Sequence, residues 1–352
     1  MRRISRRRVI AGIASSLPIP FIMRFAHAQT SAPGPAAAAE IDIAKAKAEG
    51  KVQLYTSLDT RIVDSVIAPF KAKYGIDVQY YRGGSNDVTS KVLAEVDAGR
   101  VQVDMVDASD LASLLLMKDR GLLKPFKSAS AAAIAANLRD PDSTWTTDRL
   151  TQAIIQYNAK ELGAKPPQTW KDLLALNGRL VYFSSPNGDG APRLYTLAKH
   201  FGWDFLEGVA ATKPMRVQSP QLLTQALERG ERAAGLLQND NIAWRSKAEG
   251  KPTDYAFPTD GVPTELGACG LIKASARPHA AALFYEWWMG KEGQELLVKG
   301  GKYSSRGEME PPKDLAPIAN LKLIMLDYDE WRKERPKVLD ELTKIFGGEW
   351  GN

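Results

Sequence analysis

Apolar residues along this chain change repeatedly between two spacings, and each spacing predicts one kind of element. Val52 and Leu54 alternate with more polar neighbours and predict a strand at 51–56, after which apolar positions recur with helical spacing from 62 to 74. Further strands are expected at 76–80 and 101–106, each followed by a helical stretch. This repeated strand–helix order predicts an α/β fold with a mostly parallel sheet covered by helices.

The same pattern begins again after a polar stretch at 138–149. Strands are expected at 153–158 and 178–183, with a further helix and strand before residue 240. The C-terminal third turns helical, with an apolar stripe between Val338 and Phe346. Because chains much longer than about 250 residues tend to divide into domains, we expect two lobes.

The first 28 residues have the layout of an export signal. Basic residues precede an apolar run and a small-residue site at Ala26–Ala28, and Ser5–Ile10 matches the twin-arginine pattern. The apolar run contains two prolines and is shorter than the roughly 20 residues that a spanning helix needs. We therefore expect residues 1–28 to be a cleaved twin-arginine signal peptide, residues 29–39 to be a flexible leader, and the protein to be periplasmic.

Charge argues against nucleic acid or an anionic membrane as partner. The chain of 352 residues has 47 Lys and Arg against 41 Asp and Glu, but six arginines and no acidic residue lie within 1–28. After cleavage, basic and acidic residues are equal in number, and the strong positive field that such partners require is lost. A single cysteine, Cys269, rules out an internal disulfide, and its apolar setting predicts an inert buried thiol.

Sequence motifs typical of catalysis are missing. The chain has no G-x-S-x-G, H-E-x-x-H, G-x-x-x-x-G-K or G-x-G-x-x-G pattern and no Cys/His cluster for zinc. Only His200 and His279 remain after the signal, and both read as structural histidines. We therefore predict that the protein is not an enzyme.

Three turns after expected strands have the composition of a ligand site. Ligands of parallel sheets bind beyond the carboxyl ends of the strands, where glycine permits close approach and helix N-termini favour anions. The candidates in these turns are Thr56, Ser57, Gly84, Ser85, Asn187, Gly188 and Asp189. Ser, Asn and Asp also favour simple helix capping, so both roles stay open for each residue.

Several segments, in order along the chain, resemble the periplasmic substrate-binding proteins of ABC importers. They are Tyr157-Asn158, 167–174 (PQTWKDLL), 257–263 (FPTDGVP), 290–297 (GKEGQELL) and 300–306 (GGKYSSR). The resemblance is to the branch that contains ferric-iron binders, with relatives that take phosphonates, sugar phosphates, thiamine or polyamines. It covers residues from about 50 to 312.

The resemblance implies a type II periplasmic-binding fold, in which two α/β lobes are joined by crossing hinge strands and close on a ligand. The lobes expected here are residues 40–150 with 264–315, and residues 151–263 with 316–352, which carry the C-terminal helices. The implied partners are a small-molecule ligand, an ABC permease and its ATPase, and we expect a monomer that is not embedded in the membrane. A ligand sensor with the same fold is an alternative, because cleft closure serves both roles.

The resemblance also bears on the cargo. Iron-binding relatives have a tyrosine pair after the strand that here ends at Leu237, whereas this chain has Gln238-Asn239-Asp240-Asn241. Tyr80 and Tyr81 are adjacent on a strand and point to opposite faces, so at most one could enter a cleft. Amide and carboxylate groups suit a small organic anion or zwitterion, which is the cargo we predict. A ferric or other metal ion is the alternative, and no cofactor is expected.

Further candidates complete the predicted site. Asn239 and Asp240 stand where the tyrosine pair would be, and Glu265 could hold a polar or cationic group. Arg193 and Arg306 could clamp a carboxylate or phosphate, and Tyr303 could stack on a flat ligand, although such residues are more often surface or packing residues.

Overall fold

The computed structural model describes residues 39–184, 190–348 and 350. The predicted signal peptide and the leader up to residue 38 lie outside the described residues, as do Asn187, Gly188 and Asp189. In the described part of the chain, no helix combines the length and the apolar character needed to cross a membrane.

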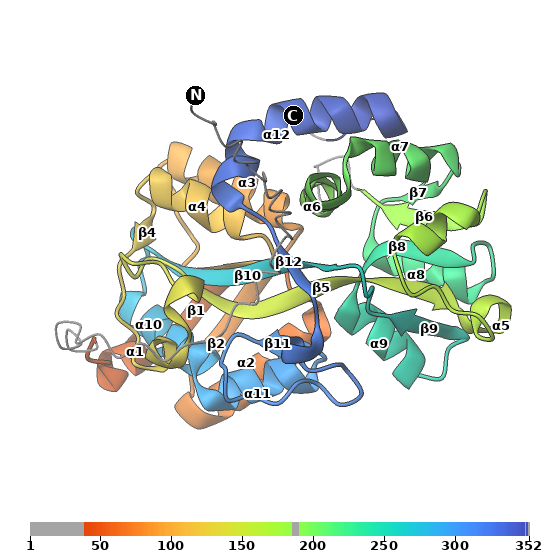
Figure 1. Ribbon diagram of the computed structural model, residues 1–352. Helices are drawn as coiled ribbons and strands as arrows, with labels where there is room; N and C mark the ends of the chain where they lie inside the picture. Colours follow the sequence, from red (N-terminus) through yellow and green to blue (C-terminus); the bar gives the residue numbers. More distant parts are fainter. Residues whose placement is uncertain (1–38, 185–189, 349, 351–352) are drawn as a thin grey trace, which may run out of the picture. The chain divides into compact units, whose positions relative to one another are not determined.

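Strands and helices alternate through most of the described chain, as the sequence pattern predicts (Figure 1). The strands are β1 (Lys51–Thr56), β2 (Asp77–Arg82), β3 (Met105–Ala108), β4 (Leu123–Lys124), β5 (Thr146–Asn158), β6 (Leu180–Phe183), β7 (Met215–Val217), β8 (Ala234–Asn239), β9 (Thr253–Ala256), β10 (Val262–Ile272), β11 (Tyr303–Ser304) and β12 (Leu323–Met325).

The helices are α1 (Ile43–Glu49), α2 (Thr60–Tyr74), α3 (Ser85–Asp97), α4 (Leu111–Asp119), α5 (Ala159–Leu162), α6 (Ala191–Phe201), α7 (Trp203–Ala211), α8 (Pro220–Glu228), α9 (Asp240–Ala248), α10 (Pro278–Met289), α11 (Lys291–Lys299) and α12 (Tyr328–Phe346). Short 3₁₀ turns occupy Ser130–Ala133, Ala136–Leu138, Lys171–Ala175 and Ile318–Asn320.

The strands pair in the order β2-β1-β3-β10-β5-β8-β6-β7, with the four others attached at the sides. β2, β1 and β3 are parallel to one another, and so are β8, β6 and β7. β5 and β10 run antiparallel to their main neighbours. The sheet is thus mixed, and the parallel order predicted from the strand–helix alternation holds for its two outer parts.

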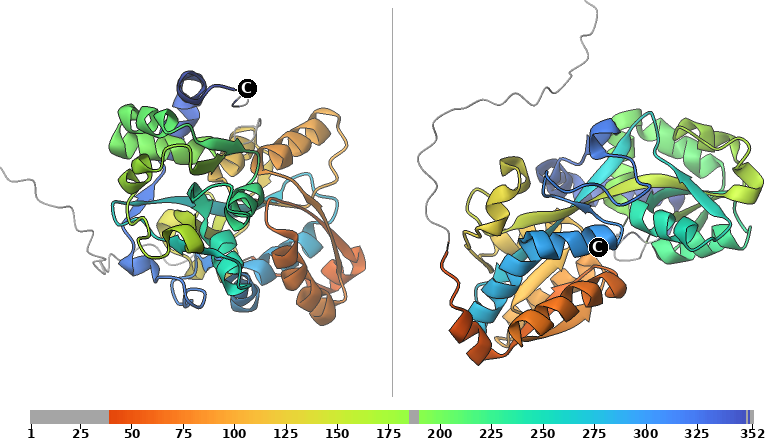
Figure 2. Two further views of the ribbon diagram at one scale, coloured as in Figure 1. Left: turned by 90° about the vertical axis from the view of Figure 1, so that its right-hand side faces the viewer. Right: turned by 90° about the horizontal axis from the view of Figure 1, so that it is seen from below.

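Two strands join the two halves of the sheet. β5 pairs with β10 up to Gln152 and with β8 from Ala153 onward, so one continuous strand belongs to both halves. Figure 2 shows the two groups of helices that result, one of mainly orange and light-blue segments and one of green to teal segments. This is the two-lobed α/β architecture expected from the sequence.

Each half has its own aromatic packing. In the first half, Phe70 of α2 lies edge-on against Phe284 of α10, with ring centroids 4.9 Å apart, and Trp288 packs on the same Phe284 ring at 5.6 Å. In the second half, Tyr195 of α6 lies 5.7 Å from Trp331 of α12. The C-terminal helix is therefore part of the core, as its apolar stripe predicts.

The start of β5 differs from the sequence expectation. The polar stretch at 138–149 predicts a loop between the strands. Residues 146–149 instead form the N-terminal part of β5 and are buried. Arg149 is buried with its guanidinium on Asp107 at 2.5 Å and on Asp148 at 2.8 Å. A Cβ on Gly267 would lie 2.8 Å from Arg149, so this glycine makes room for the arginine.

Candidate functional site

A cavity of about 870 Å³ lies beyond the carboxyl ends of the parallel strands in both halves. Ser57 follows β1, Gly84 follows β2, Ser109 follows β3, and Asn239 ends β8. This is where open α/β sheets bind ligands, because the loops at that edge are free of strand pairing. The cavity is lined by Ser57, Arg82, Gly84, Ser85, Asn86, Asp87, Thr89, Ser90, Leu93, Ser109, Asp110, Ala112, Ser113, Leu116, Phe183, Gly190, Pro192, Arg193, Pro220, Asn239, Glu265, Asp329, Trp331, Arg332, Lys333 and Arg335.

Three helices begin at the cavity. The Asp87 carboxylate accepts from the Gly84 backbone N–H at 3.1 Å at the start of α3, and Asp110 accepts from the Ala112 N–H at 3.0 Å at the start of α4. At the start of α6 no described side chain caps the helix, and its N-cap Gly190 has φ +95°. A Cβ there would lie 2.8 Å from the Phe183 carbonyl oxygen, so only glycine brings the α6 N-terminus this close to the end of β6.

Arg193 is the most buried cation of the cavity wall. Its guanidinium pairs with the Glu265 carboxylate, donates to the Asn239 amide oxygen, and donates to the Leu237 carbonyl oxygen at 3.0 Å. The Phe183 ring lies 5.4 Å from its guanidinium carbon. Among the described residues, Arg193 Nε has no hydrogen-bond partner. Arg193 thus links the first turn of α6 to the end of β8 and to strand β10.

The floor of the cavity is polar and continues into the buried charges below it. Ser57 Oγ lies 2.9 Å from Ser109 Oγ, and the Ser109 N–H donates to Ser57 Oγ at 2.7 Å. Arg149 Nη2 donates to Ser109 Oγ at 3.0 Å. Burial raises the pKa of Asp107 to about 6, although Arg149 acts in the opposite direction. The two serines therefore separate the ligand space from a buried arginine with two carboxylates.

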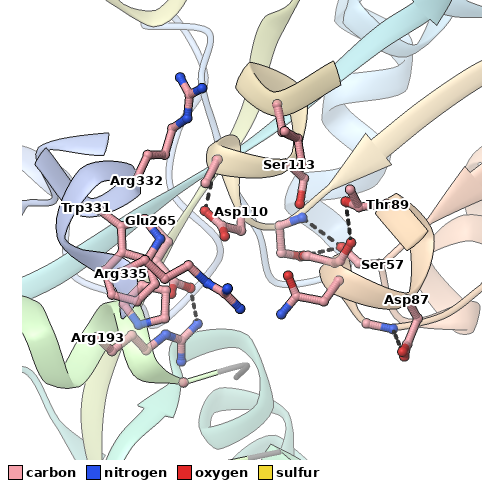
Figure 3. Close-up of a pocket in the computed structure, with 18 of the residues that line it drawn as sticks. Ser57, Asp87, Thr89, Asp110, Ser113, Arg193, Glu265, Trp331, Arg332 and Arg335 are labelled. Carbon is pink, nitrogen blue, oxygen red and sulfur yellow. Dashed lines mark hydrogen bonds and ion pairs between the residues drawn. The ribbon is translucent and has the colours of Figure 1, made fainter. Parts of the chain in front are cut away.

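The C-terminal helix α12 supplies the remaining wall. It packs against α4 of the first half and against α6 and α7 of the second. Figure 3 shows Arg193, Glu265 and Arg335 on one side of the cavity, facing Ser57, Thr89 and Asp87 on the other. Arg332 points away from this space and pairs with Asp119.

Six of the predicted site residues lie together on this cavity: Ser57, Gly84, Ser85, Arg193, Asn239 and Glu265. Thr56 does not line it, because its hydroxyl is buried and donates to Asp107 at 2.5 Å. Adjacent residues at a strand end point to opposite faces, which explains why Thr56 is inside and Ser57 is at the cavity. Contact of any of these residues with a ligand remains a prediction.

Asp240 lies beneath the cavity wall. Its carboxylate is fully buried and accepts from the Gln152 N–H at 3.1 Å and the Asn241 N–H at 2.7 Å, where β5 passes between the halves. Burial raises the pKa of Asp240 to about 6. Burial also lowers the pKa of Lys302 to about 8, and this ammonium donates to the Asn241 amide oxygen at 2.8 Å.

Tyr303 and Arg306 likewise lie outside the set of cavity-lining residues. The buried Tyr303 hydroxyl donates to the Ala316 carbonyl oxygen at 2.6 Å. Arg306 donates to the backbone carbonyl oxygens of Ser130 and Met289, each at 3.0 Å, and so ties its own loop to the first half.

Sequence reasoning missed two groups of cavity residues. Ser109 and Asp110 follow the third strand in the same way that Ser57 follows the first, so the strand-end argument could have included them. Arg332 and Arg335 lie on a helix whose alternating charges are typical of a solvated face, and only tertiary packing brings this helix to the cavity, where Arg335 points into the space and Arg332 lies at its edge.

The two adjacent tyrosines of β2 lie outside the cavity lining. The Tyr80 hydroxyl donates to Asp64 at 2.9 Å, and the Tyr81 ring lies edge-on to Tyr55 with centroids 5.4 Å apart. Within the described ranges, no group of three or more His, Cys, Asp and Glu side chains is arranged to hold a metal ion.

Comparison with known proteins gives a family and several neighbours. The family described as "Bacterial extracellular solute-binding protein" matches residues 65–316. An uncharacterized protein of Haemophilus influenzae is 27% identical over 317 residues, which cover 84% of this chain and 90% of the relative.

Two solved structures share the fold. The periplasmic binding protein AfuA of Actinobacillus pleuropneumoniae, with fructose-6-phosphate bound, has a TM-score of 0.74 at 22% identity and covers 84% of this chain and 98% of its own. Iron-bound HitA of Pseudomonas aeruginosa has a TM-score of 0.72 at 20% identity, with coverage of 84% and 99%.

Proposed function

The chain belongs to the family of bacterial extracellular solute-binding proteins, and we propose that it captures a small organic anion or zwitterion in the cavity between its two halves. The expected class of protein, a solute-binding component of the kind that serves ABC importers, agrees with the family. The chemistry of the ligand is inferred from the cavity wall.

The observation that carries this proposal is a buried arginine, Arg193, in the cavity wall at the first turn of α6. Arg193 has one carboxylate partner, Glu265, and keeps its Nε hydrogen without a partner in the described part of the chain. The α6 N-terminus beside it has a glycine, Gly190, as N-cap, and no described side chain caps it. Helix N-termini and arginine both stabilise oxyanions, and Glu265 could accept from an amine or hydroxyl on the same ligand.

A ferric ion is the second candidate, since one solved neighbour is described as iron-bound. Fe(III) is a hard ion that favours anionic oxygen ligands such as phenolates. Among the described residues that line the cavity there is no tyrosine and no histidine. The lining has five cationic side chains, four arginines and Lys333, and four carboxylates, Asp87, Asp110, Glu265 and Asp329. The lack of phenolates together with the arginines favours an anionic ligand over a bare cation.

Capture would proceed by hinge closure. Because β5 crosses from one half to the other at Gln152–Ala153, rotation about this point changes the distance between α3 and α4 on one side and α6 on the other. A ligand that touches both sides binds the closed state more tightly, and this difference in affinity shifts the equilibrium toward closure.

Export and delivery complete the proposal. Residues 1–28 would direct the chain through the twin-arginine route, and the mature monomer would present its closed form to an ABC permease and ATPase. A sensor that passes the closed form to a receptor differs from this only in the partner, so co-purification with a permease distinguishes the two.

The test is calorimetry on the mature protein from Gln29, with inorganic phosphate, fructose 6-phosphate, citrate, an amino acid and a ferric salt as probes. We expect an oxyanion to bind, and at one hundred times its dissociation constant to stabilise the fold by about 2.7 kcal/mol in a thermal unfolding assay. Binding of the ferric salt alone, with no effect of any organic anion, would overturn the proposed ligand class.

A further inference from the structure

We propose that α12 is part of the ligand site and that Arg335 binds the anionic group of the ligand together with Arg193. This inference rests on the function proposed above and names the residues that would recognise its ligand. It adds to the two sheet halves a third source of ligand contacts, located at the C-terminal end of the chain.

Arg335 is placed for this role. Its side chain lines the cavity and points into the space next to Arg193 and Glu265 (Figure 3). It is partly buried. No described residue forms a hydrogen bond or an ion pair with it. A guanidinium that is half withdrawn from water without a partner is ready to pair with an incoming oxyanion, and its planar fork suits carboxylate and phosphate oxygens.

Three of the other four cations on α12 have local partners, and the fourth, Lys333, is exposed whereas Arg335 is partly buried. Arg332 pairs with Asp119 of α4, Lys337 lies 3.1 Å from Glu334, and Lys344 lies 2.8 Å from Glu341. Exposed pairs of this kind are the usual way in which a charged helix face is balanced. Arg335 instead lies toward the cavity.

The helix does not depend on Arg335 for its position. Trp331 is buried against Tyr195, and Val338, Leu339 and Leu342 are buried on the same face. The Leu266 N–H of β10 donates to the Tyr328 hydroxyl at 2.9 Å, and Lys199 of α6 pairs with Glu330 at 2.8 Å. Apolar burial and these bonds fix α12, so a change at Arg335 is expected to leave the fold intact.

The location of α12 also bears on specificity. The family match covers residues 65–316, and α12 begins at Tyr328, beyond its end. The loops at the strand ends lie largely within the matched segment, whereas Arg335 does not. In this chain, ligand preference would therefore depend in part on a segment outside the one that defines the family.

The experiment compares Arg335→Gln, Arg335→Lys and Lys337→Gln in the mature protein. Lys337→Gln is the matched control, because it removes one positive charge from the same helix at a side chain that is 78% exposed and does not line the cavity. Calorimetric titrations use inorganic phosphate, fructose 6-phosphate and citrate, with fructose as the uncharged counterpart of the sugar phosphate.

For each oxyanion that binds the wild type, we expect Arg335→Gln to weaken binding about tenfold or more, as loss of one charge-assisted hydrogen-bond pair requires. Arg335→Lys should recover part of the loss, and Lys337→Gln should stay within about twofold of the wild type. Any binding of fructose should be the same in all four proteins, which separates charge recognition from a general disturbance of the cavity.

Two results contradict the proposals in different ways. If an oxyanion binds the wild type and Arg335→Gln binds it equally well, the role of α12 is wrong and the proposed function stands. If neither these three oxyanions nor the amino acid binds the wild type, the proposed function fails and this inference fails with it. Thermal unfolding of each variant checks that the fold is retained.

Discussion

Arg149 and Arg193 are both almost completely buried, but their partners differ. Arg149 lies between two carboxylates, Asp107 and Asp148, and also donates to Ser109. Arg193 has one carboxylate, Glu265, and its other partners are neutral oxygens. With Arg335 nearby, the region around Arg193 has more positive than negative charge at short range.

This comparison separates a structural arginine from one that is placed to bind a ligand. Arg149 has two carboxylate partners, and the Trp288 N–H adds a hydrogen bond of 2.8 Å to one of them, Asp148. Arg193 has a single carboxylate partner and lines the cavity. Among the described residues, the Nε of neither arginine has a hydrogen-bond partner, so burial and an open Nε do not separate the two residues, whereas the number of carboxylate partners and the position at the cavity do.

The largest expected effect comes from removing Arg149. Arg149→Met leaves Asp107 and Asp148 buried without their cation, and loss of one partner from such a cluster costs about 3–5 kcal/mol of unfolding free energy. Urea unfolding measures this loss. The control, Arg229→Met, removes an exposed arginine that pairs only with Glu231 and should change stability by about 0.5 kcal/mol or less.

A stable Arg149→Met variant would contradict the view that this cluster is held together by charge. The companion measurement is ligand affinity in whatever folded protein remains. Since Arg149 reaches the cavity only through Ser109, its loss should affect affinity less than stability.

The next largest effect is a pH dependence of stability due to Asp240. Its buried carboxylate, unlike those of Asp107 and Glu265, forms no hydrogen bond with an arginine of the described chain. Burial raises its folded-state pKa to about 6, above the usual 3.8. A raised pKa means that the folded protein binds the proton more tightly than the unfolded chain does. The stability that this proton binding contributes is complete below about pH 4 and is lost as pH rises through 6.

The measurement is the difference in unfolding free energy between wild type and Asp240→Asn from pH 4 to 7. We expect this difference to fall as pH rises, by on the order of 3 kcal/mol at most. Asp77→Asn is the control, because Lys71 lowers the pKa of the exposed Asp77 and its contribution should change in the opposite direction. If the difference in unfolding free energy between wild type and Asp240→Asn does not change with pH, the ionised Asp240 carboxylate is stabilised in the folded protein as strongly as in water, and its pKa is not raised.

The smallest effect concerns Arg193 itself. Arg193→Gln should weaken oxyanion binding by about 10- to 100-fold, equivalent to about 1.5–3 kcal/mol, with a smaller loss of stability because Glu265 is partly exposed. Adding Glu265→Gln removes the unpaired carboxylate, so the double variant should regain stability without regaining affinity. Calorimetry and urea unfolding on the same samples separate these quantities, and restored affinity in the double variant would assign Arg193 a purely structural role.

Much of the fold could be predicted from the sequence, because its signals are local. Alternation at 51–56 coincides with β1, and helical spacing up to Tyr74 coincides with the end of α2. The strand predicted at 101–106 is β3, which lies at 105–108. It begins later than predicted because the buried Asp104 belongs to the preceding turn, where its carboxylate accepts from the Gln53 N–H. The charged start of β5 was not predicted, because charged residues predict an exposed segment unless their partners are known. The partner of Arg149, Asp107, is more than 40 residues away in sequence.

The candidate site was predictable where it follows from strand ends and not where it depends on packing. Ser57, Gly84 and Ser85 follow parallel strands, and the fold brings those ends together. Asp240 also follows a strand, but its side chain turns inward to cap the Gln152 and Asn241 amides. The position of Arg335 depends on how α12 packs on α4 and α6, which no short-range pattern records.

Cys269 lies in the middle of β10, fully buried, with its sulfur 3.4 Å from that of Met289, and burial raises the pKa of its thiol well above the usual value. A thiol in this state reacts slowly with alkylating reagents. A second cysteine introduced by mutation at the rim of the cavity could therefore be labelled selectively with a fluorophore in the native protein. The chain is thus already suited to conversion into an optical reporter of its own ligand, with no need to remove its natural cysteine first.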